Sequence, residues 1–170
     1  RMARAAEQGF TVPVFHGTAS PTGDAFESYD LNRLGSNTRQ GEGELGVFSS
    51  AQPWLADNYA EIAGRGGWGG GTPGAPYVRP ELARLRNPKR YATASEFYRD
   101  AEARKTSLNN WRADLQSEGY DGVVVRPDGE EVVVFHPGDL RSAFDPFHPG
   151  GEARVGLPRP GDYKVGGSLP

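Results

Sequence analysis

The chain has 170 residues, enough for one domain with a hydrophobic core, and a net charge of −3, which gives no general attraction to nucleic acid. It has no cysteine, which excludes disulfides and thiolate metal sites. The histidines His16, His136 and His148 lack metal-ligand spacing, so we expect no metal site. No apolar run approaches the ~18 residues of a membrane span. We therefore expect no membrane association, no signal peptide and a soluble protein.

The first half of the chain predicts two short strands and one helix. Residues 1–11 are expected to be an entering helix or a linker, and because the chain opens inside this helical pattern we expect a domain of a longer polypeptide. The apolar run Val12–His16 predicts a strand, and residues 19–45 predict polar, glycine-rich loops. Residues 46–50 predict a second strand. A helix is predicted from Pro53, a residue suited to the first helical position, up to the glycine-rich stretch 64–74.

The second half predicts one strand, helices and a hairpin. Residues 77–85 predict a strand in which Pro80 favours an edge or a bulge. Thr93–Glu96 matches a capping box, and Gly119 is a C-cap candidate. The remaining expected elements are helices over 94–104 and 108–118, hairpin strands over 120–126 and 131–135, and a Pro/Gly-rich tail over 148–170. Because strands and helices do not alternate, the pattern indicates an α+β fold.

Three stretches together resemble the ADP-ribosyltransferases of the diphtheria-toxin and poly(ADP-ribose) polymerase type. The first is His16-Gly17-Thr18, where that family has His-Gly followed by Ser or Thr. The second is the stretch 46–50, where Phe48 stands at the family's tyrosine; Ala56 and Tyr59 follow at eight and eleven positions, as the family's helix has it. The third is the strand that begins at Glu131 and resembles the family's Glu strand.

Further likeness to bacterial and phage members lies in Asn87-Pro88, in the stretch 119–123 and in the exit segment 135–143. The resemblance implies an ADP-ribosyltransferase fold with split antiparallel sheets around an NAD+ cleft, over residues 12–147. Two departures matter. Phe48 lacks the hydroxyl of the usual tyrosine, and Gly129 replaces the Glu or Gln that arginine-modifying members carry two positions before the catalytic Glu, which makes arginine a less favoured acceptor.

The reaction breaks the bond between nicotinamide and ribose in NAD+, which is a co-substrate. Nicotinamide leaves as a neutral molecule and the ribose passes through an oxocarbenium-like state. Glu131 is the expected catalytic carboxylate, because it can accept a hydrogen bond from the ribose 2″-hydroxyl and stabilise positive charge. Since successive strand residues face opposite sides, only one of Glu130 and Glu131 can enter the cleft, and Glu130 is the candidate if the register slips by one.

The resemblance also implies contacts to the dinucleotide. His16 is expected to bind the adenine-side ribose, and the Gly17 backbone to bind the carboxamide, with a hydroxyl contact from Thr18. Phe48 and Tyr59 are expected to sandwich the nicotinamide ring, with core packing as the alternative, and Ser49 to help hold the carboxamide. We expect the loop 32–45 to cover the dinucleotide as a lid.

The leading function is a mono-ADP-ribosyltransferase that acts as a bacterial or phage toxin or effector in the cytoplasm of a target cell. Its acceptor is a macromolecule, a protein rather than RNA, and an immunity protein is an expected partner. The alternatives are an NAD+ glycohydrolase on the same scaffold and an inactive NAD+- or protein-binding module. A basic cluster is either a solvated face or a docking surface for acidic protein or RNA phosphates; its members are Arg79, Arg84, Arg86, Lys89 and Arg90.

Overall fold

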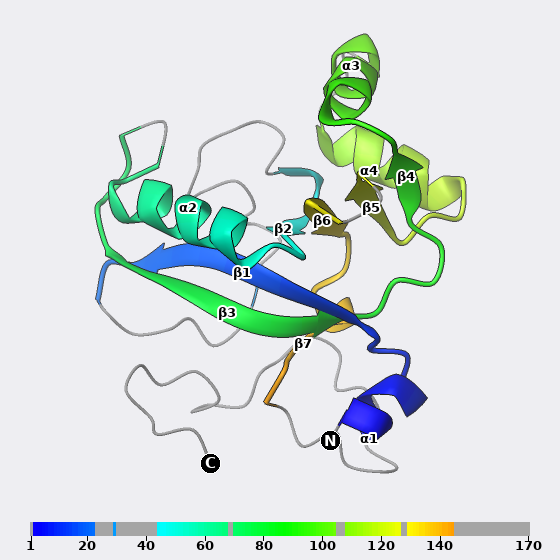
Figure 1. The fold of residues 1–170 in the computed structure, drawn as a ribbon. Helices are drawn as coiled ribbons and strands as arrows, with labels where there is room; N and C mark the ends of the chain where they lie inside the picture. Colours follow the sequence, from blue (N-terminus) through cyan, green and yellow to red (C-terminus); the bar gives the residue numbers. More distant parts are fainter. Residues whose placement is uncertain are drawn as a thin grey trace.

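The computed structural model describes residues 2–22, 29, 44–67, 70–104, 108–126 and 129–144. Two sheets lie side by side, with strand orders β1-β3-β7 and β2-β6-β5-β4 (Figure 1). The strands are β1 (Val12–Ser20), β2 (Val47–Ser49), β3 (Ala75–Ala83), β4 (Lys89–Tyr91), β5 (Gly122–Val125), β6 (Glu131–Val134) and β7 (Leu140–Ser142). The helices are α1 (Met2–Glu7), α2 (Pro53–Gly64), α3 (Ala94–Arg104), α4 (Leu108–Ser117) and the short 3-10 helix η3 (Pro137–Asp139).

The α+β prediction is confirmed, but the expectation of purely antiparallel sheets is wrong. The first sheet is antiparallel, whereas the second is mixed because β4 pairs with β5 in parallel. Neither β4 nor β7 was predicted from the sequence. Each has three residues and carries charged side chains, so no apolar alternation marks it.

The first sheet is built on a nine-residue ladder between β1 and β3, which runs from Val12 opposite Ala83 to Ser20 opposite Ala75. The strand predicted over 12–16 thus continues for four more residues, of which only Thr18 has a high strand propensity, because β3 pairs with its whole length. Among the described residues β3 has a partner on both sides only where β7 pairs with it, from Glu81 to Ala83, so Pro80 has the local edge position that the sequence favoured. Pro80 lies just beyond the last β3–β7 pair, Glu81 with Ser142, where the ladder needs no donor from it.

The second sheet contains the predicted hairpin. β5 and β6 are antiparallel from Gly122 opposite Val134 to Val125 opposite Glu131, and β2 pairs with the other edge of β6. Both faces of the hairpin are buried, as its valine runs predicted. Val133 and Val123 belong to a cluster with α3 and α4, and Val132 and Val134 to a cluster between the two sheets.

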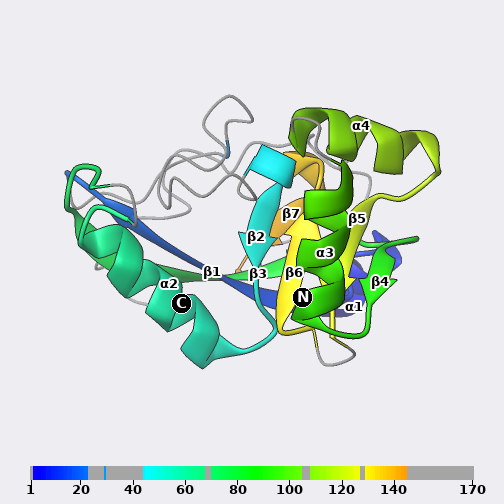
Figure 2. The ribbon, with the colours of Figure 1, turned by 90° about the horizontal axis from the view of Figure 1, so that it is seen from above.

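Helices α3 and α4 cover the outer face of the second sheet, next to β5 and β6 (Figure 2). Phe97, Trp111 and Leu115 are fully buried there. The capping box is confirmed: the N–H of Glu96 donates to the Thr93 hydroxyl at 3.1 Å, and the Glu96 carboxylate accepts from the N–H of Ala92. The predicted C-cap is confirmed by the left-handed φ of +90° at Gly119.

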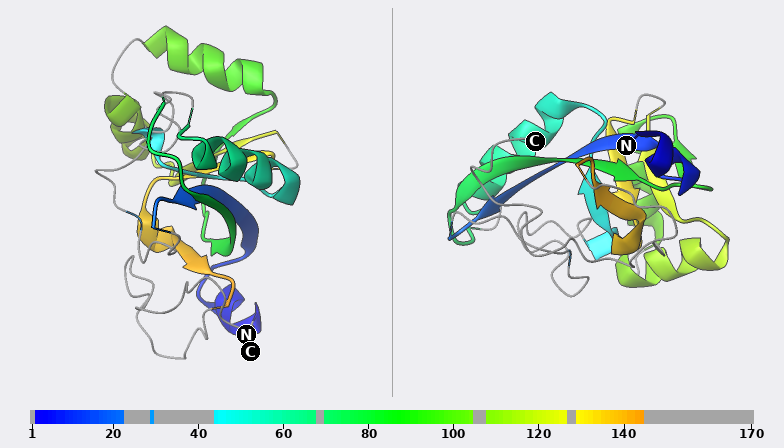
Figure 3. Two further views of the ribbon diagram at one scale, coloured as in Figure 1. Left: turned by 90° about the vertical axis from the view of Figure 1, so that its left-hand side faces the viewer. Right: turned by 90° about the horizontal axis from the view of Figure 1, so that it is seen from below.

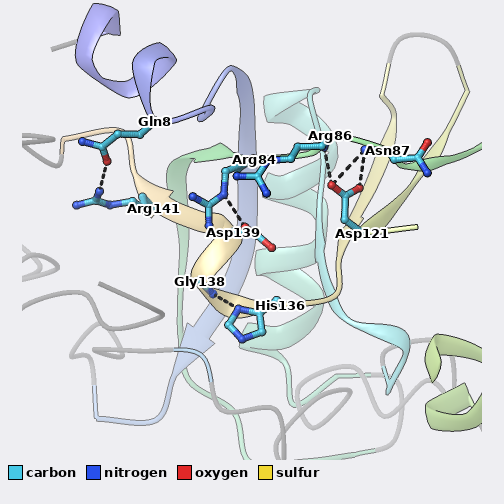
Figure 4. A network of polar contacts seen from close by, with 9 residues as sticks. All are labelled: Gln8, Arg84, Arg86, Asn87, Asp121, His136, Gly138, Asp139 and Arg141. Carbon is cyan, nitrogen blue, oxygen red and sulfur yellow. Dashed lines mark hydrogen bonds and ion pairs between the residues drawn. The ribbon is translucent and has the colours of Figure 1, made fainter. Parts of the chain in front are cut away.

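Helix α1 packs on the domain, so the helix expected within residues 1–11 is confirmed. Figure 3 shows α1 below one end of the β1–β3 ribbon and α2 above the ribbon. Phe10, which follows α1, is fully buried, and the guanidinium groups of Arg84 and Arg141 lie 4.8 and 5.6 Å from its ring centroid. Figure 4 shows that Gln8 binds Arg141, which ties the end of α1 to β7, and that Asp139 binds Arg84, which ties η3 to the end of β3.

Other predictions fall outside the described residues. They are the tail over 148–170, most of the lid over 32–45 and the turn residues 127–128 of the hairpin.

Candidate functional site

The two sheets meet through β1 and the end of β2. The N–H of Phe15 donates to the carbonyl of Ser50 at 2.7 Å, and the N–H of Ser50 donates back to the carbonyl of Phe15 at 2.9 Å. One residue further along, the His16 side chain crosses the same junction, with its Nδ1 2.6 Å from the carbonyl oxygen of Phe48. Because a carbonyl only accepts, Nδ1 carries the proton, and Nε2 of the neutral ring is a hydrogen-bond acceptor.

A second polar contact joins α2 to the start of β6. The hydroxyl of Tyr59 donates to Oε1 of Glu131 at 3.0 Å, across 72 residues of sequence. Glu130 turns the other way and forms an ion pair with Arg126. The structure therefore directs Glu131, and not Glu130, toward the helix, as the sequence register predicts.

These two contacts belong to one region of the molecule. Phe48 lies opposite Val133 in the β2–β6 ladder, and Glu131 is two residues before Val133. Side chains two apart share a face, so Phe48 and Glu131 lie on the same face of the second sheet. β1, β2, β6 and α2 adjoin there (Figures 1 and 2). The structure thus brings Phe48, Tyr59 and Glu131 to one face of the second sheet. The His16 side chain lies with Thr18 on the β1 face opposite α2, and it reaches this region through the Phe48 carbonyl.

Phe48 also contributes to the core. It is partly buried, packs against the cluster under α3 and α4, and meets the ring of Phe97 edge to face at a centroid distance of 6.5 Å. The sequence left open whether Phe48 binds nicotinamide or packs in the core, and part of its ring does pack in the core. Tyr59 is partly buried as well.

Gly17 has two roles that its geometry separates. A Cβ at Gly17 would overlap the carbonyl oxygen of Ala56 and lie 2.8 Å from the nitrogen of Ala60, so α2 packs directly on the strand at this point. Its backbone points elsewhere. Phe15 directs its N–H and C=O away from β3, toward Ser50, and groups two residues apart point to the same strand edge. The N–H and C=O of Gly17 therefore face the open edge of β1.

Thr18 and Ser49 are placed less favourably than the sequence suggested. Thr18 is fully buried on the β1 face opposite the α2 side. The Ser49 side chain points to the face of β2 opposite Phe48, the face on which Val47 packs between the sheets. Its hydroxyl is buried and has no hydrogen-bond partner among the described residues. A ligand on the Phe48 face is not within the direct reach of Ser49.

Sequence reasoning missed a buried polar cluster beside His16. Arg79 and Glu81 are 3% and 1% exposed and form an ion pair at 3.0 Å. The Tyr29 hydroxyl donates to Oε2 of Glu81 at 2.8 Å, its ring lies 4.8 Å from the guanidinium carbon of Arg79, and it meets the His16 ring edge to face at 5.2 Å. The signal available in the sequence was the Arg-x-Glu alternation within a strand, which puts both charges on one face.

Electrostatics keep His16 neutral. Burial lowers its pKa from 6.5 to about 4, the nearby charge of Arg79 acts in the same direction, and the hydrogen bond to the Phe48 carbonyl opposes both. Burial also raises the pKa of Glu81, against the opposing effects of Arg79 and the Tyr29 hydroxyl. The imidazole is thus suited to accept a hydrogen bond, not to carry charge.

This lowered pKa predicts a loss of stability in acid. Below pH 6.5 the unfolded chain binds a proton at His16, whereas the folded protein binds this proton only near pH 4. The free energy of unfolding therefore falls as the pH drops through this window. The expected loss between pH 7 and 4.5 is roughly 2 kcal/mol. Urea unfolding at both pH values should show this loss of stability for the wild type and not for His16→Asn. The asparagine keeps a hydrogen-bond donor for the Phe48 carbonyl but does not titrate. Glu81 titrates in both proteins and cancels in the difference; parallel pH dependences would contradict the assignment.

The basic cluster expected from the sequence is mostly neutralised. Arg79 is buried in the ion pair described above, Arg84 pairs with Asp139 at 2.7 Å, and the ammonium of Lys89 lies 3.6 Å from a carboxylate oxygen of Asp100. These side chains therefore do not form one basic surface, and the prediction of a docking surface for phosphates is wrong. Residues 86–87, which lie between Arg84 and Lys89, are fixed by Asp121. Its carboxylate accepts hydrogen bonds from the backbone N–H groups of Arg86 and Asn87 (Figure 4).

Within the described part of the chain, no group of three His, Cys, Asp or Glu residues could hold a metal ion. No helix in the same ranges combines the length and hydropathy required to cross a membrane. Comparisons with protein-family models, with curated proteins and with solved structures gave no match. The functional argument therefore rests on the residues and on their geometry.

Proposed function

We propose that this protein is an ADP-ribosyltransferase that cleaves the nicotinamide–ribose bond of NAD+ and transfers ADP-ribose to a protein. The observation that carries the proposal is the meeting of Tyr59 and Glu131 at 3.0 Å beside the junction where His16 binds the Phe48 carbonyl. A sequence motif alone does not require that Tyr59 meets Glu131 or that His16 meets Phe48, since the four residues come from four separate elements. The arrangement of two sheets also suits the split-sheet fold of the family that the sequence resembles.

The residues present fit a dinucleotide. The Nε2 of neutral His16 can accept a hydrogen bond from a ribose hydroxyl. The N–H and C=O of Gly17, both directed to the open edge of β1, match the acceptor and donor of a carboxamide. The rings of Phe48 and Tyr59 offer apolar faces to nicotinamide.

The proposed reaction requires no general acid from the protein. Because nicotinamide leaves as a neutral base, no side chain has to protonate it. Glu131 would accept a hydrogen bond from the ribose 2″-hydroxyl and stabilise the positive charge that grows on the ribose as the bond breaks. The acceptor nucleophile then forms the new bond to C1″ and loses its proton.

Charge supports a protein acceptor. A nucleic-acid site needs several free cations along one surface. The basic side chains that the sequence had suggested for that role are largely paired with carboxylates: Arg79, Arg84 and Lys89. The likeness to bacterial and phage members supports a toxin or effector role, with action inside a target cell.

Incubation with labelled NAD+, alone and with a cell lysate, tests the proposal. We expect nicotinamide release together with label in protein that resists boiling in detergent. Release without incorporation would identify a glycohydrolase. The absence of nicotinamide release under both conditions would contradict the proposal and favour a binding module.

A further inference from the structure

Tyr59 stands on a rigid base. Helix α2 turns its small residues Ala56, Ala60 and Ala63 inward, and all three are buried. Ala56 and Ala60 press on the strand at Gly17, where even one methyl group does not fit. Tyr59 therefore projects from a backbone that cannot shift along β1 without a clash.

Glu131 also begins from a fixed backbone. It is the first residue of β6 and lies opposite Val125 in the hairpin ladder. Just before it, the carbonyl of Gly129 accepts a hydrogen bond from the N–H of Ala51 at 2.9 Å, which ties the hairpin turn to the end of β2. The backbone does not fix the three rotatable torsions of the Glu131 side chain, which depend on side-chain contacts. The hydroxyl of Tyr59 restrains them.

The Tyr59 hydroxyl is a permanent donor. Burial raises its pKa above the ordinary value, and the negative charges of Glu131 and Glu130 and the nearby Tyr98 phenol on α3 raise it further. Tyr59 thus keeps its proton over the whole range in which the protein is folded. A donor that never ionises favours the charged form of the carboxylate that it contacts.

We infer that Tyr59 is a positioning residue for Glu131: its hydroxyl holds the carboxylate in the orientation and the charged state required for bond cleavage, in addition to any contact of its ring with nicotinamide. The inference rests on the proposed function. It assigns to a single hydroxyl an effect on the rate of the chemical step, because the ring that would bind NAD+ is unchanged when only that oxygen is removed.

Tyr59→Phe separates the two contributions. We expect kcat for nicotinamide release to fall about 10- to 100-fold with KM changed less than about threefold, since one charge-assisted hydrogen bond is lost and the ring remains. The acidic limb of the kcat profile should move to higher pH, because the carboxylate loses a donor that favours its charged form. A purely structural role would leave that limb in place. Tyr120→Phe, at a partly buried tyrosine that precedes β5 and packs against the cluster under α3 and α4, is the matched control and should retain wild-type values.

A double-mutant cycle gives a second, independent measurement. Glu131→Asp withdraws the carboxylate from the Tyr59 hydroxyl, so the tyrosine substitution should then add little to the loss of rate. Wild-type kcat and an unchanged pH profile in Tyr59→Phe, with Glu131→Gln inactive, would overturn the inference and leave the proposed function standing. A wild-type protein that releases no nicotinamide would overturn both.

Discussion

Glu131→Gln is expected to lower the rate of nicotinamide release from NAD+ by roughly 10²–10³-fold or more, the usual loss when a group that stabilises transition-state charge is removed. The amide keeps the shape of the side chain and an oxygen that can accept from Tyr59, so the contact across the site survives in part. What disappears is the negative charge beside the ribose. Thermal unfolding should change by no more than a few degrees.

The neighbouring carboxylate supplies the control. Glu130 differs from Glu131 by one position, points to the other face and pairs with Arg126 in a partly exposed ion pair. Glu130→Gln should retain nearly full activity, because partly exposed ion pairs contribute little and the Tyr59 hydroxyl is bonded to Glu131. Equal activity in both variants would refute a catalytic role for Glu131, and inactivity in Glu130→Gln alone would show that the register argument selects the wrong residue.

Local patterns predicted those parts of the fold that local chemistry fixes. The hairpin around Gly129, the helix that starts at Pro53 and the capping box at Thr93 depend on residues close together in sequence, and all three are confirmed. The strands β4 and β7 were missed because neither has an apolar run or alternation, unlike the equally short β2, and each is a strand only through its partner. The extension of β1 was missed for the same reason: the run from Gly17 to Ser20 is a strand because β3 lies beside it.

The residues of the candidate site also fall into those that local patterns predicted and those that they did not. His16, Tyr59 and Glu131 could be chosen from their motifs, and the facing direction of Glu131 followed from strand alternation. The cluster of Tyr29, Arg79 and Glu81 was missed, because the Arg-x-Glu alternation puts two charges on one face of β3 but does not show that Tyr29, 52 residues before Glu81, contacts them. Ser49 shows the opposite failure. The alternation that turns the Phe48 side chain to the face of Glu131 turns the Ser49 side chain to the opposite face.

Gly17→Ala is expected to destabilise the protein by about 3 kcal/mol or more, at the upper end of the cost of adding a methyl group to a packed interior. The new Cβ would meet backbone atoms of Ala56 and Ala60, and neither can rotate away as a side chain could. Either α2 must lift from β1 or the strand must bend. Both movements carry Tyr59 away from Glu131, so loss of stability and loss of activity should appear together.

Gly119→Ala is the comparison for Gly17→Ala. Gly119 has a φ of +90° and no atom within 4 Å of the position of an added Cβ, so alanine there meets only backbone strain, about 1 kcal/mol. Urea midpoints should fall much further for Gly17→Ala than for Gly119→Ala. If Gly17→Ala unfolds like the wild type yet fails to cleave NAD+, the glycine is required for the ligand and not for the helix. Because the Cβ of residue 17 points at α2 while its N–H and C=O point at the open edge, we expect the packing defect to dominate and to remain in the absence of any dinucleotide.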